Sequence, residues 1–443
     1  MTATTEPANA DPTDRAAYRS WAQRRVLRAL VVAQVFGGAG LAAGVSVGAL
    51  LARDLLGSTT GAGLPAALFT AGSAGTAAAV GRLSQRYGRR IGLTSGYAAG
   101  AAGGAGVALA AVTGNVPLLL VSLFVYGAGT ATNLHCRYAG ADLADESHRG
   151  RAVSTVLVAT TLGAVAGPNL LRITGDLAET AGLPRLSGPF ILASTVYATA
   201  GLVVAVLLRP DPLLTARQLA VTDGHVPAAP IPRSAPTTAH GGAPPDPFRN
   251  DPVAWWQGRR PLVLAASGMV LAQAVMVAVM TMTPVHLETH HHGLGAVGLV
   301  IGLHIGAMYL PSPLTGRLVD RFSPAATAAA GGAVLVTSAL TAAAAGPSAT
   351  TLGVALVLLG LGWNLSLVGG TALVTNLTTL DDRARTQGSV DLGVALAGTV
   401  GGLSSGAVVA AGSFEALGLL TAGLAALIIL SLVRARQHAI ATT

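Results

Sequence analysis

Long apolar runs separated by short polar segments fill the chain from residue 27 to residue 433. The runs are continuous and about twenty residues long, which is the length of a helix that crosses the hydrocarbon core of a bilayer. A transmembrane β-barrel would instead alternate polar and apolar positions in segments of about ten residues. The pattern therefore predicts an all-α membrane protein with twelve transmembrane helices. The predicted spans are 27–51, 62–82, 91–112, 116–136, 152–173, 189–208, 261–283, 296–316, 325–345, 350–372, 388–411 and 415–433.

The amino-acid composition indicates that most of the protein's surface faces a lipid bilayer. Only 10% of the 443 residues are charged and 51% are hydrophobic, whereas soluble proteins carry about 25% charged residues. The 57 glycines and the small aromatic fraction of 4% suit helices that approach closely through small residues. The chain has too little charge to cover a surface that faces water.

The basic residues fix the expected orientation. All 27 are arginines, and with a cytoplasmic N-terminus only Arg53, Arg172 and Arg185 would face outward. The other 24 lie in or beside cytoplasmic segments, as the positive-inside rule requires. We therefore expect a multi-pass protein of the cytoplasmic membrane with both termini in the cytoplasm. The net charge of +8 follows from this topology, so no nucleic-acid partner is expected.

Two halves are expected on either side of a linker. Residues 1–208 form an N-terminal six-helix half, preceded by a polar cytoplasmic segment at 1–25. Residues 209–258 hold ten of the 23 prolines and are expected to form a flexible cytoplasmic linker. Residues 259–443 form a C-terminal six-helix half. The protein is expected to work as a monomer.

An internal repeat supports the duplicated architecture. The stretch "GRLSQRYGRR" at 81–90 follows the second span, and "GRLVDRFS" at 316–323 follows the eighth, at an offset of 235 residues. "RGRA" at 149–152 and "RART" at 383–386 are offset by 234 residues. Two landmarks at nearly one offset indicate two copies of one six-helix unit.

At these loops the chain resembles the major facilitator superfamily of secondary transporters. The resemblance implies two halves that rock around a central site, with the loop residues acting as a gate in which arginine pairs with a carboxylate or a helix end. In the first copy Gln85 replaces the usual aspartate, so that copy loses a charge. The expected gate residues are Gly81, Gln85, Arg86, Gly88, Arg89, Arg90, Gly316, Asp320 and Arg321.

The fifth span carries a second signature. Gly163, Gly167 and Pro168 resemble the antiporter motif of proton-coupled drug exporters within this superfamily. The same residues could equally form only a small-residue packing face followed by a kink. The resemblance keeps a proton-coupled exporter of drugs or small apolar metabolites open as an alternative.

Soft metal ligands are concentrated in one window. All five internal methionines and half of the ten histidines lie within residues 269–308. Met276 and Met280 are four residues apart, as are His304 and Met308, so each pair shares a helix face. Thioether and imidazole are uncharged ligands that favour Cu(I). A metal-capture role is possible for the connecting loop, which offers His286, His290, His291 and His292.

The two pairs resemble the signature of bacterial copper importers, a subgroup of the superfamily. The resemblance implies that Met276, Met280, His304 and Met308 bind copper as a transported substrate, with no resident cofactor. Two alternatives stay open: methionines at this spacing are often ordinary apolar packing, and the subgroup includes importers of other cargo such as riboflavin.

Other polar residues within spans are candidates for coupling or substrate contact. Asp391 lies about one and a half turns past Arg385, where an acid can carry protons or pair with an arginine. His135, Cys136 and Arg137 could form an exit site, or Arg137 could be an anchor at the membrane edge. Asn133, Gln273, Trp363 and Asn364 are expected near a cavity. No nucleophile–base pair or phosphate-binding loop is recognisable, so an enzyme is not expected.

Overall fold

The computed structural model describes residues 11–56, 64–223 and 252–441, and within these ranges the fold is built from α-helices and short 3-10 turns. The six helices of the first half are α1 (Pro12–Leu56), α2 (Leu64–Tyr87), α3 (Arg89–Thr113), α4 (Val116–Ala141), α5 (Arg149–Thr180) and α6 (Gly188–Leu207). A short helix follows, α7 (Pro212–Thr222). The second half contains α8 (Pro252–Thr289), α9 (Leu294–Tyr309), α10 (Ser312–Arg321), α11 (Pro324–Ala343), α12 (Ala349–Asn376), α13 (Arg383–Ala411) and α14 (Phe414–Ala441).

Within the described residues, each predicted span corresponds to helix in the structure, which confirms the all-α fold. In the described part, nine helical segments are long and apolar enough to cross a membrane. Helices α1, α2 and α5 lie alongside them in the first half. The eighth span is split into α9 and α10, because Pro311 and Pro313 lack the N–H groups that would continue the helix.

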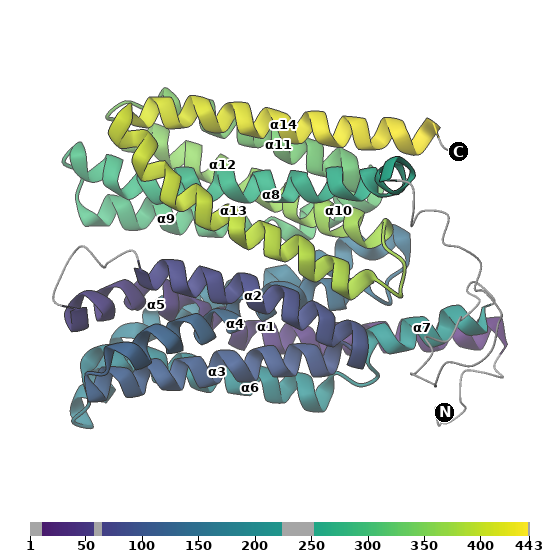
Figure 1. Cartoon of the computed structure of the whole chain (residues 1–443), viewed down its shortest axis with the longest axis horizontal. Coiled ribbons are helices and arrows are strands. Elements are labelled where there is room, and N and C mark those ends of the chain that lie inside the picture. The colour runs from purple at the N-terminus through teal and green to yellow at the C-terminus, as the bar shows by residue number, and fades with distance from the viewer. Residues whose placement is uncertain (1–10, 57–63, 224–251, 442–443) are drawn as a thin grey trace.

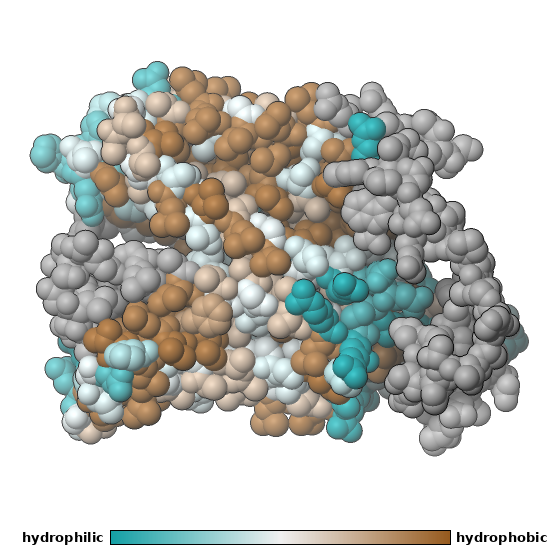
Figure 2. Space-filling model, viewed as in Figure 1, coloured by the Kyte–Doolittle hydropathy of each residue, from teal (hydrophilic) through white to brown (hydrophobic). Residues whose placement is uncertain are grey.

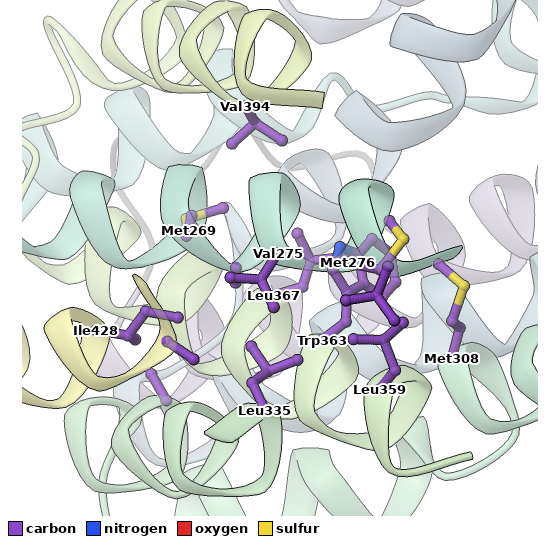
Figure 3. Close-up of a cluster of buried hydrophobic side chains, with 14 of the residues drawn as sticks. Met269, Val275, Met276, Met308, Leu335, Leu359, Trp363, Leu367, Val394 and Ile428 are labelled. Carbon is purple, nitrogen blue, oxygen red and sulfur yellow. The ribbon is translucent and has the colours of Figure 1, made fainter. Parts of the chain in front are cut away.

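The helices form two bundles. In Figure 1, α1–α6 are drawn in the lower part and α8–α14 in the upper part. The first bundle has a core rich in aromatic rings, in which Tyr126 lies 5.6 Å from both Phe190 and Tyr197, measured between ring centroids. The core of the second bundle contains Met269, Trp363 and Ile428 (Figure 3). The second cluster also includes Ala141, Val153 and Leu157 of the first bundle, so it extends across the interface between the two bundles.

The outer surface is suited to lipid. Hydrophobic side chains cover the middle of the face shown in Figure 2, and hydrophilic ones gather toward its ends. Leu162, Val121, Leu202 and Leu299 are all more than 60% exposed. Exposure of so many large apolar side chains to water would be costly, so this surface faces the bilayer.

The segment expected to be a flexible linker is partly helical. Residues 212–222 form α7, and residues 252–258 are the first turns of α8. Helix α7 forms because Asp211 caps its N-terminus and because Leu213 and Leu219 are buried against the first bundle. Residues 224–251 lie outside the described part.

Hydrogen bonds join the two bundles at one end. In the described part, the hydrogen bonds that join them involve residues 85–151 and 217 on one side and residues 320–391 on the other. These residues lie where α2, α4, α10 and α12 end and where α5 and α13 begin. We call this the arginine-rich end, because the repeated loops with their arginines lie here. The molecule is closed at this end.

Candidate transport gate and substrate site

Glycines bring the two bundles into backbone contact at the arginine-rich end. A Cβ atom on Gly81 of α2 would lie 2.7 Å from the carbonyl oxygen of Ala384 and 2.8 Å from Cα of Gly388 on α13. In the second copy, a Cβ on Gly316 of α10 would lie 2.7 Å from the carbonyl oxygen of Gly150 on α5. The first glycine of each motif is therefore required for α2 to meet α13 and for α10 to meet α5.

Gln85 caps the start of α13 across the interface. Its Oε1 accepts hydrogen bonds from the backbone N–H groups of Ala384, at 2.7 Å, and Arg385, at 3.3 Å. Its Nε2 donates to the carbonyl oxygens of Leu380, at 3.1 Å, and Asp381. The first N–H groups and the carbonyls of the preceding turn lack helical partners. An amide can serve both kinds of group, which explains why glutamine works where the family has aspartate.

Asp320 makes the equivalent cap in the second copy. Its Oδ1 accepts from the backbone N–H of Gly150 at 2.8 Å, and its Oδ2 accepts from the N–H of Arg151 at 3.2 Å. The Nε of Arg151 adds an ion pair at 2.9 Å, although that side chain is 55% exposed. A buried carboxylate at the N-terminus of a helix is favoured by the helix dipole. Gln85 and Asp320, 235 residues apart, thus close the two sides of the interface in the same way.

The remaining motif residues have different tasks. Arg89 is fully buried; its Nε donates to Asp142 at 2.7 Å, and its Nη2 donates across the interface to Gln387. Arg90 donates its backbone N–H to Asp211 at 2.8 Å. Gly88 has a φ of 93°, which favours glycine.

Two motif arginines point away from the interface. Arg86 and Arg321 are exposed, and each guanidinium lies over the ring of the next residue, Tyr87 at 5.0 Å and Phe322 at 5.7 Å. The expected pairing of a motif arginine with a carboxylate therefore holds for Arg89 within the first half, while the carboxylate that crosses the interface in the second copy is Asp320.

A buried charge cluster lies just inside the gate. Nη2 of Arg137 on α4 donates to Oδ1 of Asp391 on α13 at 2.5 Å, and the hydroxyl of Tyr138 donates to the same oxygen at 3.1 Å. Nε of Arg137 also donates to Thr371 of α12 at 3.0 Å. Oδ2 of Asp391 has no hydrogen bond and lies 3.6 Å from Nε2 of His135. Asp391 thus pairs with an arginine of the other bundle rather than with Arg385.

The predicted ligand pairs lie on two helices that flank α12. Helix α12 packs against both α8 and α9, which contact each other little. Met276 and Met308 belong to one buried apolar cluster with Leu359 and Trp363 (Figure 3), and Met280 packs against that cluster. The thioethers are thus part of a packed core.

His304 is fully buried beside α12. Its Nδ1 donates to the carbonyl oxygen of Leu356 at 2.8 Å, which leaves Nε2 as the unprotonated nitrogen of the neutral ring. That Nε2 has no described hydrogen-bond partner. Among the described residues, no group of three His, Cys, Asp or Glu side chains is arranged to hold a metal.

Two of the loop histidines bind the neighbouring loop. Nε2 of His286 donates to the carbonyl oxygen of Gly346, and Nε2 of His292 donates to that of Pro347, both at 2.8 Å. Nδ1 of His290 is bonded to the carbonyl oxygen of His286, also at 2.8 Å. His291 has a positive φ of 61° at the turn. The imidazoles of His286 and His292 therefore connect the α8–α9 loop to the α11–α12 loop.

The fifth-span signature includes one packing glycine. A Cβ on Gly163 would lie 2.6 Å from the backbone nitrogen of Ala39, so α5 and α1 meet closely there. The backbone of Gly167 and Pro168 continues α5, and their surroundings lie outside the described part.

An aromatic and amide group joins three helices of the second bundle. The indole N–H of Trp363 donates to Oε1 of Gln273 at 2.8 Å. The ring of Tyr309 lies 5.9 Å from that of Trp363, edge to face. Nδ2 of Asn364 donates to the carbonyl oxygen of Met308 and to Ser312, both at 2.7 Å. Asn364 therefore satisfies a carbonyl at the break between α9 and α10.

Sequence reasoning missed several residues of the gate. Asp142, Gln387 and Arg217 all bind groups that are distant in sequence. Asp142 gave only a weak local signal, because it is one of three acids, with Asp145 and Glu146, in the segment that follows α4. Nothing local pointed to Gln387 or Arg217. Asn133, which was expected near a cavity, is buried, and its Oδ1 accepts a hydrogen bond from Nε2 of Gln34 at 3.5 Å.

Two pseudo-symmetric helical bundles, closed against each other at one end by reciprocal helix caps, define a multi-pass membrane transporter rather than an enzyme. Comparison with known proteins gives the family. The sequence profile of the Major Facilitator Superfamily matches residues 28–367 and 268–442. This chain belongs to that superfamily.

Three relatives illustrate the relationship. The chain is 50% identical over 413 residues to the uncharacterized MFS-type transporter YdeG of Bacillus subtilis (strain 168), covering 92% of this chain and 90% of the relative. It is 28% identical over 418 residues to the riboflavin transporter RfnT of Brucella anthropi, covering 93% and 96%. The crystal structure of the human organic anion transporter MFSD10 (TETRAN) shares the fold, with a TM-score of 0.70, 17% identity, and coverage of 93% and 99%. The copper-importer subgroup gains no support from these comparisons.

Proposed function

We propose that this chain is a secondary active transporter of the cell membrane that moves a small organic solute by alternating access. The observation that carries the proposal is the pair of reciprocal caps at the arginine-rich end, Gln85 on α13 and Asp320 on α5. The hydrogen bonds between the bundles can break while most contacts within each bundle are kept. They therefore suit a gate.

The arginine-rich end is proposed to face the cytoplasm, because arginines are retained on that side of bacterial and other membranes. Both termini then lie in the cytoplasm. With the gate closed at this end, the state described here blocks passage to the cytoplasm. The gradient that drives the exchange then decides between import and export.

The group formed by Gln273, Trp363 and Tyr309 supports an organic solute. Aromatic rings bind planar organic molecules by stacking, and an amide beside them supplies one donor and one acceptor. The relation to a riboflavin transporter makes riboflavin the first solute to test.

Protons are proposed as the coupling ion, with Asp391 as the site. This carboxylate is 5% exposed, bridges the two bundles through Arg137, and has one oxygen without a hydrogen bond. Protonation of Asp391 would remove its charge and weaken the bridge, so that proton entry and gate opening are linked.

Copper import through Met276, Met280, His304 and Met308 is the second candidate. Two observations favour it: Met276 and Met308 share one buried cluster, and Nε2 of His304 has no described partner. The thioethers and the ring of Trp363 belong to the same buried cluster, so packing alone does not separate copper from an organic solute. A proton-coupled exporter remains a third candidate on the resemblance of Gly163, Gly167 and Pro168 alone.

The test is counterflow in proteoliposomes, with riboflavin and Cu(I) assayed in parallel. Trp363→Leu removes the ring and its donor, and we expect it to abolish riboflavin exchange. Met269→Leu, which changes a buried methionine outside the predicted pairs, is the matched control and should retain exchange. If instead Cu(I) is exchanged and His304→Ala abolishes it, copper replaces riboflavin as the cargo. If neither is exchanged, the organic class is tested next with anionic and sugar solutes, and riboflavin is rejected.

A further inference from the structure

Helix α7, between the two halves, lies across the closed gate. Asp211 caps its N-terminus: Oδ1 of this residue accepts hydrogen bonds from the N–H groups of Leu213 and Leu214, both at 3.1 Å. Oδ2 of the same carboxylate accepts from Arg90 N–H at the start of α3. A Cβ on Gly88 would lie 2.5 Å from this oxygen, so the second glycine of the motif makes room for Asp211. One carboxylate therefore caps two helices and fixes α7 to the gate loop.

The rest of α7 is also attached to the first bundle. Leu213 and Leu219 are buried, Leu219 belongs to the core of the first bundle, and α7 packs against α1, α3 and α4. At the other end, Nη1 of Arg15 on α1 pairs with Asp223 at 2.7 Å and donates to the carbonyl oxygen of Thr222 at 3.2 Å. When the bundles rock apart, α7 must move with the first one.

Arg217 on α7 reaches the second bundle. Its Nε and Nη2 donate to the carbonyl oxygen of Leu380, in the turn before α13, at 3.3 and 3.2 Å. Its Nη1 and Nη2 donate to the carbonyl oxygen of Gln85, both at 3.2 Å. The Leu380 carbonyl also accepts from Nε2 of Gln85. One guanidinium thus joins the gate glutamine to the turn that it caps.

From these contacts we infer that α7 is a strap that holds the arginine-rich gate closed, with Arg217 as its attachment to the second bundle. The planar guanidinium can bind two carbonyls at once, which a single ammonium cannot do in the same geometry. Opening at this end separates Gln85 from Leu380, so it must also release Arg217. The strap adds to the gate a contact that the repeated loop motifs do not contain, since the second half has no counterpart of α7 in the described part.

The experiment measures the gate and needs no cargo, so its outcome is independent of the proposed solute. Nitroxide labels at Arg82→Cys on α2 and Ser389→Cys on α13, both exposed positions beside the contact of Gly81 with Gly388, report the opening by double electron–electron resonance. Arg217→Gln should raise the open population about tenfold relative to the closed one, since charged hydrogen bonds to two carbonyls are lost. Gln218→Ala, at the neighbouring exposed position of α7, should leave the distances unchanged. Equal distributions for Arg217→Gln and the unsubstituted protein would overturn the proposal.

A tether provides the second arm, in which a reversible covalent link replaces the contact of the Arg217 guanidinium and its reversal serves as the control for folding. A short reversible cross-linker between Arg217→Cys and Asp381→Cys should hold the label distance in its closed range under conditions that open the uncross-linked protein, and reduction should restore opening. Cys136 is the one native cysteine and is fully buried, so it does not compete. Opening in the cross-linked protein would show that α7 does not restrain the gate.

Discussion

Replacing Asp320 with alanine removes three accepted hydrogen bonds that exist only while the gate is closed. Loss of a helix N-cap costs about 1 kcal/mol. Loss of a negative charge at the start of α5 costs about 0.5 kcal/mol. The bond with the exposed Arg151 adds about 0.5 kcal/mol after allowance for solvent. The sum of about 2 kcal/mol predicts a shift of about thirtyfold toward the open state.

The assay is a distance measurement between labels at Thr155→Cys on α5 and Arg317→Cys on α10, both exposed positions near this contact. Arg151→Gln is the matched control: it removes the ion pair but keeps the cap, so its shift should stay below about threefold. If Arg151→Gln opened the gate as much as Asp320→Ala, the surface ion pair rather than the cap would hold the gate, and the reasoning would be refuted.

Three further predictions concern Gly81, Asp391 and Asn364. Gly81→Val should prevent close approach of α2 to α13 and lengthen the distance between labels on these helices, whereas Gly75→Val, where a side chain meets nothing within 4 Å, should not. Asp391→Asn should retain solute exchange but abolish accumulation driven by a pH gradient; accumulation equal to that of the unsubstituted protein would rule out Asp391 as the coupling site. Asn364→Leu should lower the free energy of unfolding by about 2–4 kcal/mol, since a buried carbonyl and two hydroxyls lose their partner, and thermal unfolding checks this.

The helices could be predicted because lipid imposes a rule on length and composition, and in the described part nine of the predicted spans meet that rule. The break between α9 and α10 was not predicted, although Pro311 and Pro313 inside the span gave a local signal for it. Asn364 stabilises the break by donating to the carbonyl oxygen of Met308. Helix α7 was also missed. Its sequence is short and weakly apolar, and a cap at Asp211 together with contacts from other helices stabilises it.

The gate motifs were recognisable, but their partners were not. Gln85 and Ala384 are 299 residues apart, and Arg137 and Asp391 are 254 apart, so no local pattern links them. The substitution of glutamine for aspartate suggested a weaker gate in the first half. The structure shows a residue that caps N–H groups and also donates to carbonyls, which aspartate could not do at neutral pH.

The measurement that bears most directly on the account is the distance between labels at Arg82→Cys and Ser389→Cys in lipid nanodiscs, first in the otherwise unsubstituted protein and then with Gln85→Ala and Asp320→Ala combined. We expect one dominant short distance in the first sample and a majority of a longer distance in the second, because both caps are then absent. A single short distance in both samples would contradict the claim that reciprocal capping holds the two bundles together.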